Sequence, residues 1–81
     1  MTIKKIGDFT FIGESSKTRN GFKHHGVFFR NETEVDEADA RYTNRTYEAY
    51  EYQTVFKMAV NEAQKNHFIT AEEFNYLQNN L

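Results

Sequence analysis

Apolar and aromatic residues recur at helical spacing between residues 44 and 66. At about 100° per residue they fall within one wide stripe, which is typical of an amphipathic helix packed on a core. Asn44 or Thr46 is suited to cap the N-terminus, and the helix is expected to end near Asn66. The stripe consists of Ala49, Tyr52, Val55, Phe56, Ala59, Val60 and Ala63, with Glu48, Glu51 and Glu62 along one polar edge.

Two segments rich in aromatic residues predict a β-hairpin near the start of the chain. Residues 8–13 alternate well enough for a strand, and residues 22–30 supply its partner. The polar residues 14–21 between them contain Asn20-Gly21, a strong hairpin signal. The expected structure is a hairpin with a long, basic tip, and Gly26 in its second strand is interpreted as a β-bulge.

A third strand is expected over residues 33–43, after a turn at Asn31-Glu32. Successive side chains of a strand point to opposite faces. Small side chains on one face would allow the long helix to approach it closely. The two expected faces are Ala38, Ala40 and Tyr42 on one side, and Asp39, Arg41 and Thr43 on the other.

The C-terminal segment carries its own helix start signal. Thr70 followed by Glu73 forms a capping box, and Ile69 with Phe74 forms a hydrophobic staple. The helix is expected to run from Ala71 to about Asn79. Its buried side chains are expected to be Phe74 and Leu77, with Leu81 as a further candidate.

These elements predict an α+β fold of one domain covering residues 1–81. The expected order is β-β-β-α-α: a small antiparallel three-stranded sheet, a long amphipathic helix and a short C-terminal helix. A chain of 81 residues is near the lower limit of what folds unaided. Cysteine is absent, so neither disulfides nor a thiolate zinc site can stabilise the fold. The core must therefore depend on aromatic residues, of which the chain has 8 Phe and 5 Tyr.

Composition and charge narrow the class of function. No run approaches the roughly 20 apolar residues of a membrane span, and the N-terminus lacks the apolar stretch of a signal peptide, so we expect a cytoplasmic protein that does not bind membranes. The net charge of −2 argues neither for a strong nucleic-acid binder nor for a heavily charged DNA mimic. The charge is uneven, however: residues 1–30 are mainly basic, whereas residues 31–40 are strongly acidic.

The acidic residues 31–40, which we call the acidic decade, are the first candidate site. This segment lacks the central Gly and the spacing of oxygen ligands that a calcium loop requires. A solvated acidic loop is the simpler interpretation. The functional interpretation is phosphate mimicry, in which carboxylates occupy the nucleic-acid groove of an enzyme. The partner-binding residues would be Glu32, Glu34, Asp36, Glu37 and Asp39.

The long helix also carries a second stripe, opposite its core stripe. Tyr and Met are enriched at protein interfaces, and an aligned apolar stripe is more informative than scattered residues. Coverage by another element of the fold explains the stripe equally well. As a partner-binding face it would consist of Tyr47, Tyr50, Thr54 and Met58.

The basic hairpin is the alternative site, for nucleic acid. Cationic side chains flanked by aromatics can contact phosphates, although no helix-turn-helix, zinc finger or phosphate-binding loop accompanies them. A solvated turn is the simpler interpretation. The candidate nucleic-acid residues are Lys17, Arg19, Lys23 and His25.

The sequence offers no metal site, cofactor motif or catalytic constellation. His24 and His25 are adjacent on a strand and point to opposite faces, so they cannot chelate one ion together. Ser15 and Ser16 are expected in a turn, far in sequence from any Asp–His combination. We therefore expect a protein that is not an enzyme.

Residues 42–55, which begin Tyr-Thr-Asn-Arg-Thr-Tyr-Glu, resemble a motif of short proteins from bacteriophages and mobile elements. In those proteins a Tyr-x-Asn-Arg-Thr-Trp-Glu motif precedes alternating aromatic and acidic residues. The resemblance spans residues 21–60, and Tyr47 stands where Trp is usual. The role of those proteins is unassigned, so the resemblance implies only a phage or prophage accessory protein in the cytoplasm of a bacterial host.

Two functions follow as hypotheses. The first is inhibition by protein–protein binding, with a host defence nuclease such as a CRISPR effector or a restriction enzyme as the partner. This interpretation makes the protein an anti-CRISPR or anti-restriction inhibitor. The alternative is a small nucleic-acid-binding or replication accessory protein that uses the basic hairpin. A homodimer of unstated purpose is a third option.

Overall fold

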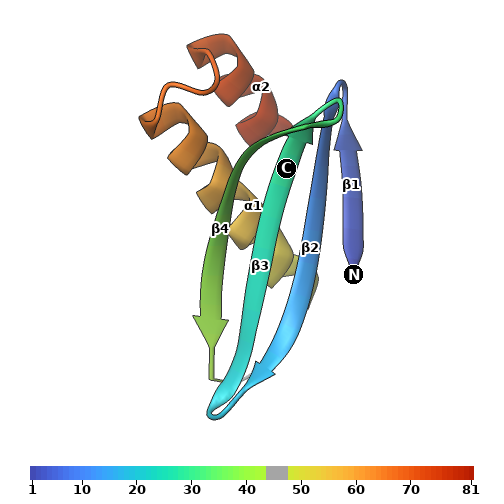
Figure 1. Ribbon diagram of the computed structural model, residues 1–81, viewed down its shortest axis with the longest axis vertical. Coiled ribbons are helices and arrows are strands. Elements are labelled where there is room, and N and C mark those ends of the chain that lie inside the picture. The colour runs from blue at the N-terminus through green and yellow to red at the C-terminus, as the bar shows by residue number, and fades with distance from the viewer. Residues whose placement is uncertain (44–47) are drawn as a thin grey trace.

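The computed structural model describes residues 1–43 and 48–81. It has two layers: a four-stranded antiparallel sheet, and two helices on one of its faces (Figure 1). The strands lie in chain order, β1-β2-β3-β4. The α+β class is confirmed, but the prediction of three strands was one short. The elements are β1 (Thr2–Ile6), β2 (Phe9–Thr18), β3 (Gly21–Arg30), β4 (Thr33–Tyr42), α1 (Glu48–Lys65) and α2 (Ala71–Asn80).

The strand missing from the prediction is β1. It pairs antiparallel with β2, which places Ile6 opposite Phe9 and Ile3 opposite Ile12. Ile6 is its one buried residue, because β1 lies at the edge of the sheet and carries two lysines. A strand of this kind lacks the apolar alternation that identifies half-buried strands in a sequence.

The hairpin of β2 and β3 is longer, and its tip shorter, than expected. Residues 14–18 continue β2, and Thr18 pairs with Gly21 across a turn at Arg19-Asn20. The prediction of a long polar tip was therefore wrong, although Asn20-Gly21 does mark the turn. Polar side chains are compatible with a strand when its backbone groups pair with a neighbour, as those of residues 14–18 do with β3.

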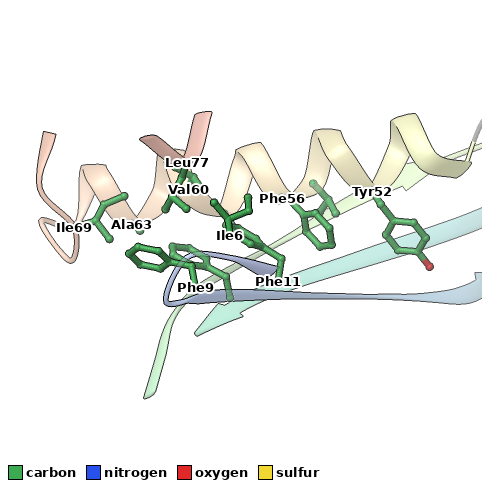
Figure 2. Close-up of a cluster of buried hydrophobic side chains, with 12 residues drawn as sticks. Ile6, Phe9, Phe11, Tyr52, Phe56, Val60, Ala63, Ile69 and Leu77 are labelled. Carbon is green, nitrogen blue, oxygen red and sulfur yellow. The ribbon is translucent and has the colours of Figure 1, made fainter. Parts of the chain in front are cut away.

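The core lies between the sheet and α1 (Figure 2). Phe11 on β2 and Phe28 on β3 are register partners whose rings stack 4.8 Å apart, and the ring of Phe56 from α1 lies 5.3 Å from Phe11. The predicted core stripe is confirmed for all its described side chains; that of Ala49 lies outside them. The buried stripe residues are Tyr52, Val55, Phe56, Ala59, Val60 and Ala63.

Residues with little or no side chain allow α1 to lie close to the sheet. Gly13, Gly26 and Ala38 are register partners across β2, β3 and β4. A Cβ atom on Gly13 would lie 2.5 Å from the Tyr52 ring, too close for any real contact. A Cβ atom on Gly26 would lie 3.0 Å from the side chains of Val55 and Phe56, so this glycine also allows the close approach of α1, and it does not mark a bulge. The irregularity of β3 and β4 lies between Phe28 and Phe29, where β4 carries the additional residue Val35.

The second helix begins as predicted. Thr70 accepts a hydrogen bond from the backbone of Glu73, and the Glu73 side chain accepts one from the backbone of Thr70, which completes the capping box. Leu77 is buried, and Phe74 and Leu81 pack partly against the core. The cap candidates of the first helix, Asn44 and Thr46, lie outside the described residues. Of the helices in the described part of the chain, neither could span a membrane.

Candidate functional site

The face of the sheet opposite the helices is covered by no described element. Strand alternation places an apolar row across it, in which Ile3, Ile12 and Val27 are register partners and Glu37 follows on β4. Ile3 is 54% exposed. Phe29, half-buried, extends the apolar surface along β3. We call this surface the open face.

The acidic decade is not a loop but most of β4. Alternation divides its carboxylates between the two faces of the sheet, so the prediction that all five form one site is wrong. Asp36 lies on the helix side, where its Oδ2 accepts a hydrogen bond from Asn66 Nδ2 at 3.1 Å, and Glu32 lies in the turn before β4. The residues that remain on the open face are Glu34, Glu37 and Asp39, as the register partners of Phe29, Val27 and His25.

The position of β4 gives these carboxylates a structural role as well. Among the described strands, β4 pairs only with β3, so it forms an edge of the sheet. Charged side chains and bulges on edge strands oppose edge-to-edge aggregation. The irregularity at Val35 and the acidic residues of β4 both have this effect.

The candidate nucleic-acid residues do not form one surface. Lys17 pairs with Phe22 on the helix side of the sheet, whereas Lys23 and His25 lie on the open face and Arg19 lies in the turn. His25 Nδ1 is 2.6 Å from Asp39 Oδ1, so an acidic side chain lies beside this candidate phosphate contact. The remaining cationic pair on the open face is Lys23 with its register partner Arg41.

The second stripe of α1 is exposed to solvent at most of the positions that the structure describes. Tyr50 is 61% exposed and Met58 is 39% exposed. Thr54 is half-buried, and its hydroxyl donates to the Tyr50 carbonyl at 3.0 Å. Tyr47 lies outside the described residues. Coverage by α2 is thus excluded for Tyr50, and a partner-binding role of this stripe stays a prediction.

A buried polar cluster joins the sheet to α1. His24, expected on the opposite face from His25, is 0% exposed on the helix side of β3. Its Nδ1 lies 2.5 Å from Ser15 Oγ on β2, and its Nε2 lies 3.1 Å from Glu51 Oε1 on α1. The Tyr52 hydroxyl lies 2.5 Å from the same Ser15 oxygen. Four side chains from three elements, β2, β3 and α1, therefore form one continuous chain of hydrogen bonds.

If His24 is neutral and Glu51 is ionised, the donors and acceptors of this cluster have one consistent order. An ionised carboxylate only accepts, so His24 Nε2 donates to Glu51. The other ring nitrogen then accepts from the Ser15 hydroxyl, and Ser15 in turn accepts from Tyr52. Glu51 is 3% exposed, and its second oxygen has no hydrogen-bond partner among the described residues.

Sequence reasoning missed this cluster for two reasons. The polar residues around Ser15 predict a turn, whereas Ser15 lies in β2 as the register partner of His24. The helical spacing predicts Glu51 on the polar edge of the helix, whereas Glu51 is buried. The sequence contains one signal for the cluster. Ser15 lies four residues after Phe11 and His24 lies four residues before Phe28, so alternation places each polar residue on the same strand face as a core residue.

The described residues contain no group of three or more His, Asp or Glu side chains that could hold a metal ion. Comparisons with protein-family models, with curated proteins and with solved structures gave no match. The geometry and chemistry of the chain itself are therefore the basis for a functional proposal.

Proposed function

We propose that the protein acts by binding another protein through the open face, as a phage-type accessory protein that inhibits a host defence nuclease. The observation that carries this proposal is the row Ile3, Ile12 and Val27, which leaves apolar side chains in the centre of a face that no described element covers. A hydrophobic centre with a polar rim is the usual anatomy of a protein interface.

Charge on the rim favours a basic partner. Glu34, Glu37 and Asp39 follow one edge of the face, each the register partner of a β3 residue. The nucleic-acid groove of a nuclease offers the complementary positive surface, and such complementarity raises association rates and selects partners. A preformed sheet also avoids the ordering cost of a flexible segment. The motif at residues 42–55, which resembles phage proteins, supports the same setting.

The proposal is tested by inhibition of DNA cleavage with a panel of RNA-guided and restriction nucleases. The test variant combines Glu34→Gln, Glu37→Gln and Asp39→Asn, and should lose inhibition while it remains folded. The matched control is Asp36→Asn, because Asp36 belongs to the same strand but faces the helices. Equal potency of the triple variant and the wild type would remove the acidic rim from the proposal.

A second variant tests the apolar centre. Val27→Lys places a charge in the middle of the open face, where a bound partner would have to desolvate it. Inhibition should fall more than with Asn61→Lys, an exposed substitution on α1. Equal inhibition by the two variants would place the contact surface elsewhere, with the stripe of Tyr50 and Met58 as the next surface to test.

The alternative, binding of nucleic acid, is favoured by the pair Lys23 and Arg41. Like charges directly opposite each other in a sheet are destabilising, and a phosphate between them would relieve the repulsion. Retention on DNA-cellulose at low salt, lost by roughly 200 mM, would support this function because phosphate contacts release counterions. The double variant Lys23→Gln, Arg41→Gln should then abolish retention.

A further inference from the structure

We propose that Ser15 is an activated nucleophile that transfers the acyl group of small carboxylic esters, with His24 as its base. The proposal rests on the buried polar cluster and is independent of the open face, which lies on the other side of the sheet. A nucleophile hydrogen-bonded to a base, which is itself oriented by a third group, defines such a site by geometry and not by sequence order. Ser15, His24 and Glu51 meet this description, at 2.5 Å and 3.1 Å.

His24 is held in the tautomer that the reaction requires. Glu51 accepts from Nε2, so Nδ1 carries the free lone pair and faces the Ser15 hydroxyl. The imidazolium that forms when His24 takes the proton is stabilised by the buried Glu51 carboxylate. This stabilisation is strong because both groups are shielded from water. Glu51 is therefore a positioning residue, which acts through His24.

Tyr52 donates a hydrogen bond to the nucleophile itself, with its hydroxyl 2.5 Å from Ser15 Oγ. Together with His24 it fixes the orientation of the Ser15 hydroxyl before a substrate arrives. The close packing of the Tyr52 ring over Gly13 holds the hydroxyl in this position.

The reaction balances without a metal or cofactor. Ser15 Oγ bonds to the ester carbonyl carbon, and its proton passes to His24 Nδ1. The tetrahedral intermediate then collapses, the C–O bond to the leaving group breaks, and the alcohol leaves with the proton from His24. Water attacks the acyl group on Ser15 with His24 again taking a proton, and the carboxylic acid is released as Ser15 recovers its hydrogen.

Access to the cluster restricts the substrate. Ser15 is exposed, whereas His24, Glu51 and Tyr52 are buried behind it. Because the base is buried, a substrate has to approach from the side of Ser15, so the proposed substrate class is a small ester with an unhindered acyl group, such as an acetate ester.

The test is covalent labelling of the full chain with a fluorophosphonate, which reacts with activated serine hydroxyls. The wild type should gain one equivalent by intact mass, and peptide mapping should place it on Ser15. Ser16→Ala is the matched control, because Ser16 is the exposed neighbour on the other face, and it should label like the wild type. No adduct on the wild type, or an adduct mapped to another residue, overturns the proposal, and neither result depends on whether a variant folds.

Turnover of p-nitrophenyl acetate separates catalysis from structure. Ser15→Ala should lose the burst of one equivalent of p-nitrophenolate. Glu51→Gln should lower kcat by about 100-fold or more, the range expected when general-base catalysis is lost, and leave KM unchanged because Glu51 does not touch the substrate. A burst of the same size in Ser15→Ala would overturn the proposal, and unchanged kcat in Glu51→Gln would remove the role of Glu51.

Discussion

The Arg30 guanidinium on β3 donates to Glu73 Oε2 on α2 at 2.6 Å, while Glu73 Oε1 accepts from the Thr70 backbone at 2.8 Å. One carboxylate therefore completes the capping box and also ties α2 to the sheet. The backbone hydrogen bond from Thr70 lowers the pKa of Glu73, partial burial opposes this shift, and the charge of Arg30 adds to the lowering. The net result is a pKa below the ordinary 4.5.

The lowered pKa predicts a stability that depends on pH. Ionised Glu73 stabilises the fold fully above its ordinary pKa of 4.5, and this contribution is lost as the pH falls through the lower pKa of the folded state. Glu73→Gln keeps a capping-box side chain but removes the charge. We expect a loss on the order of 0.5 kcal/mol at pH 7, since the pair with Arg30 is partly exposed, and a smaller loss at lower pH. Urea unfolding of the wild type and Glu73→Gln from pH 7 to about pH 3 measures this loss. A difference in the free energy of unfolding that stays constant over this range would contradict the prediction.

Close packing at Gly13 predicts a penalty for the smallest possible side chain. In Gly13→Ala the new methyl group would lie 2.5 Å from Cδ1 and 2.7 Å from Cε1 of Tyr52. We expect a loss of about 1–3 kcal/mol in the free energy of unfolding, as for other overpacked cores. The adjacent Glu14→Ala, on the open face, serves as the control and should stay within about 0.5 kcal/mol. Equal stability of the two variants would show that α1 can move away from the sheet at little cost.

The exposure of Tyr50 predicts that its side chain contributes little to folding. Tyr50→Ala should change the free energy of unfolding by less than about 0.5 kcal/mol, as for other surface substitutions. Tyr52→Ala, two residues along the same helix but buried, should lose about 3–5 kcal/mol. Chemical denaturation of both variants makes the comparison. A loss of several kcal/mol in Tyr50→Ala would assign Tyr50 to the core and remove the stripe as a binding face.

The hydroxyl of Tyr52 can be tested apart from its ring. Tyr52→Phe retains the ring contact with Phe56, 6.2 Å between centroids, and removes only the hydrogen bond to Ser15. The expected loss is about 1 kcal/mol, because Ser15 and His24 keep each other as partners. Thermal and urea unfolding of Tyr52→Phe against the wild type give the value. An unchanged stability would show that water replaces the phenol at Ser15.

Elements with regular patterns could be predicted from the sequence. The core stripe of α1 repeats with helical period, and the capping box of Thr70 and Glu73 identifies the start of α2. Strand β4 alternates clearly through Ala38 and Ala40. In each case the local pattern and the tertiary environment agree, so the sequence was sufficient.

Elements that depend on a partner for their environment could not be predicted. Strand β1 is stabilised by pairing with β2 and buries only Ile6, so its own sequence contains little signal. Glu51 has helical spacing typical of a solvated edge, yet His24 on β3 lies against it and both side chains are buried. The two faces of β4 could be assigned by alternation, but the additional residue Val35 decides which carboxylates share the open face.

The meander order of the sheet has a consequence for folding kinetics. Each strand pairs with its immediate neighbour in the chain, and no crossover connection must form first. Such local topology shortens the loops that have to close and speeds folding. The chain contains no proline, so the slow phase of prolyl isomerisation, tens of seconds or longer, has no source. Stopped-flow refolding should therefore follow a single exponential on a time scale well below about 1 s, as for other domains with local topology.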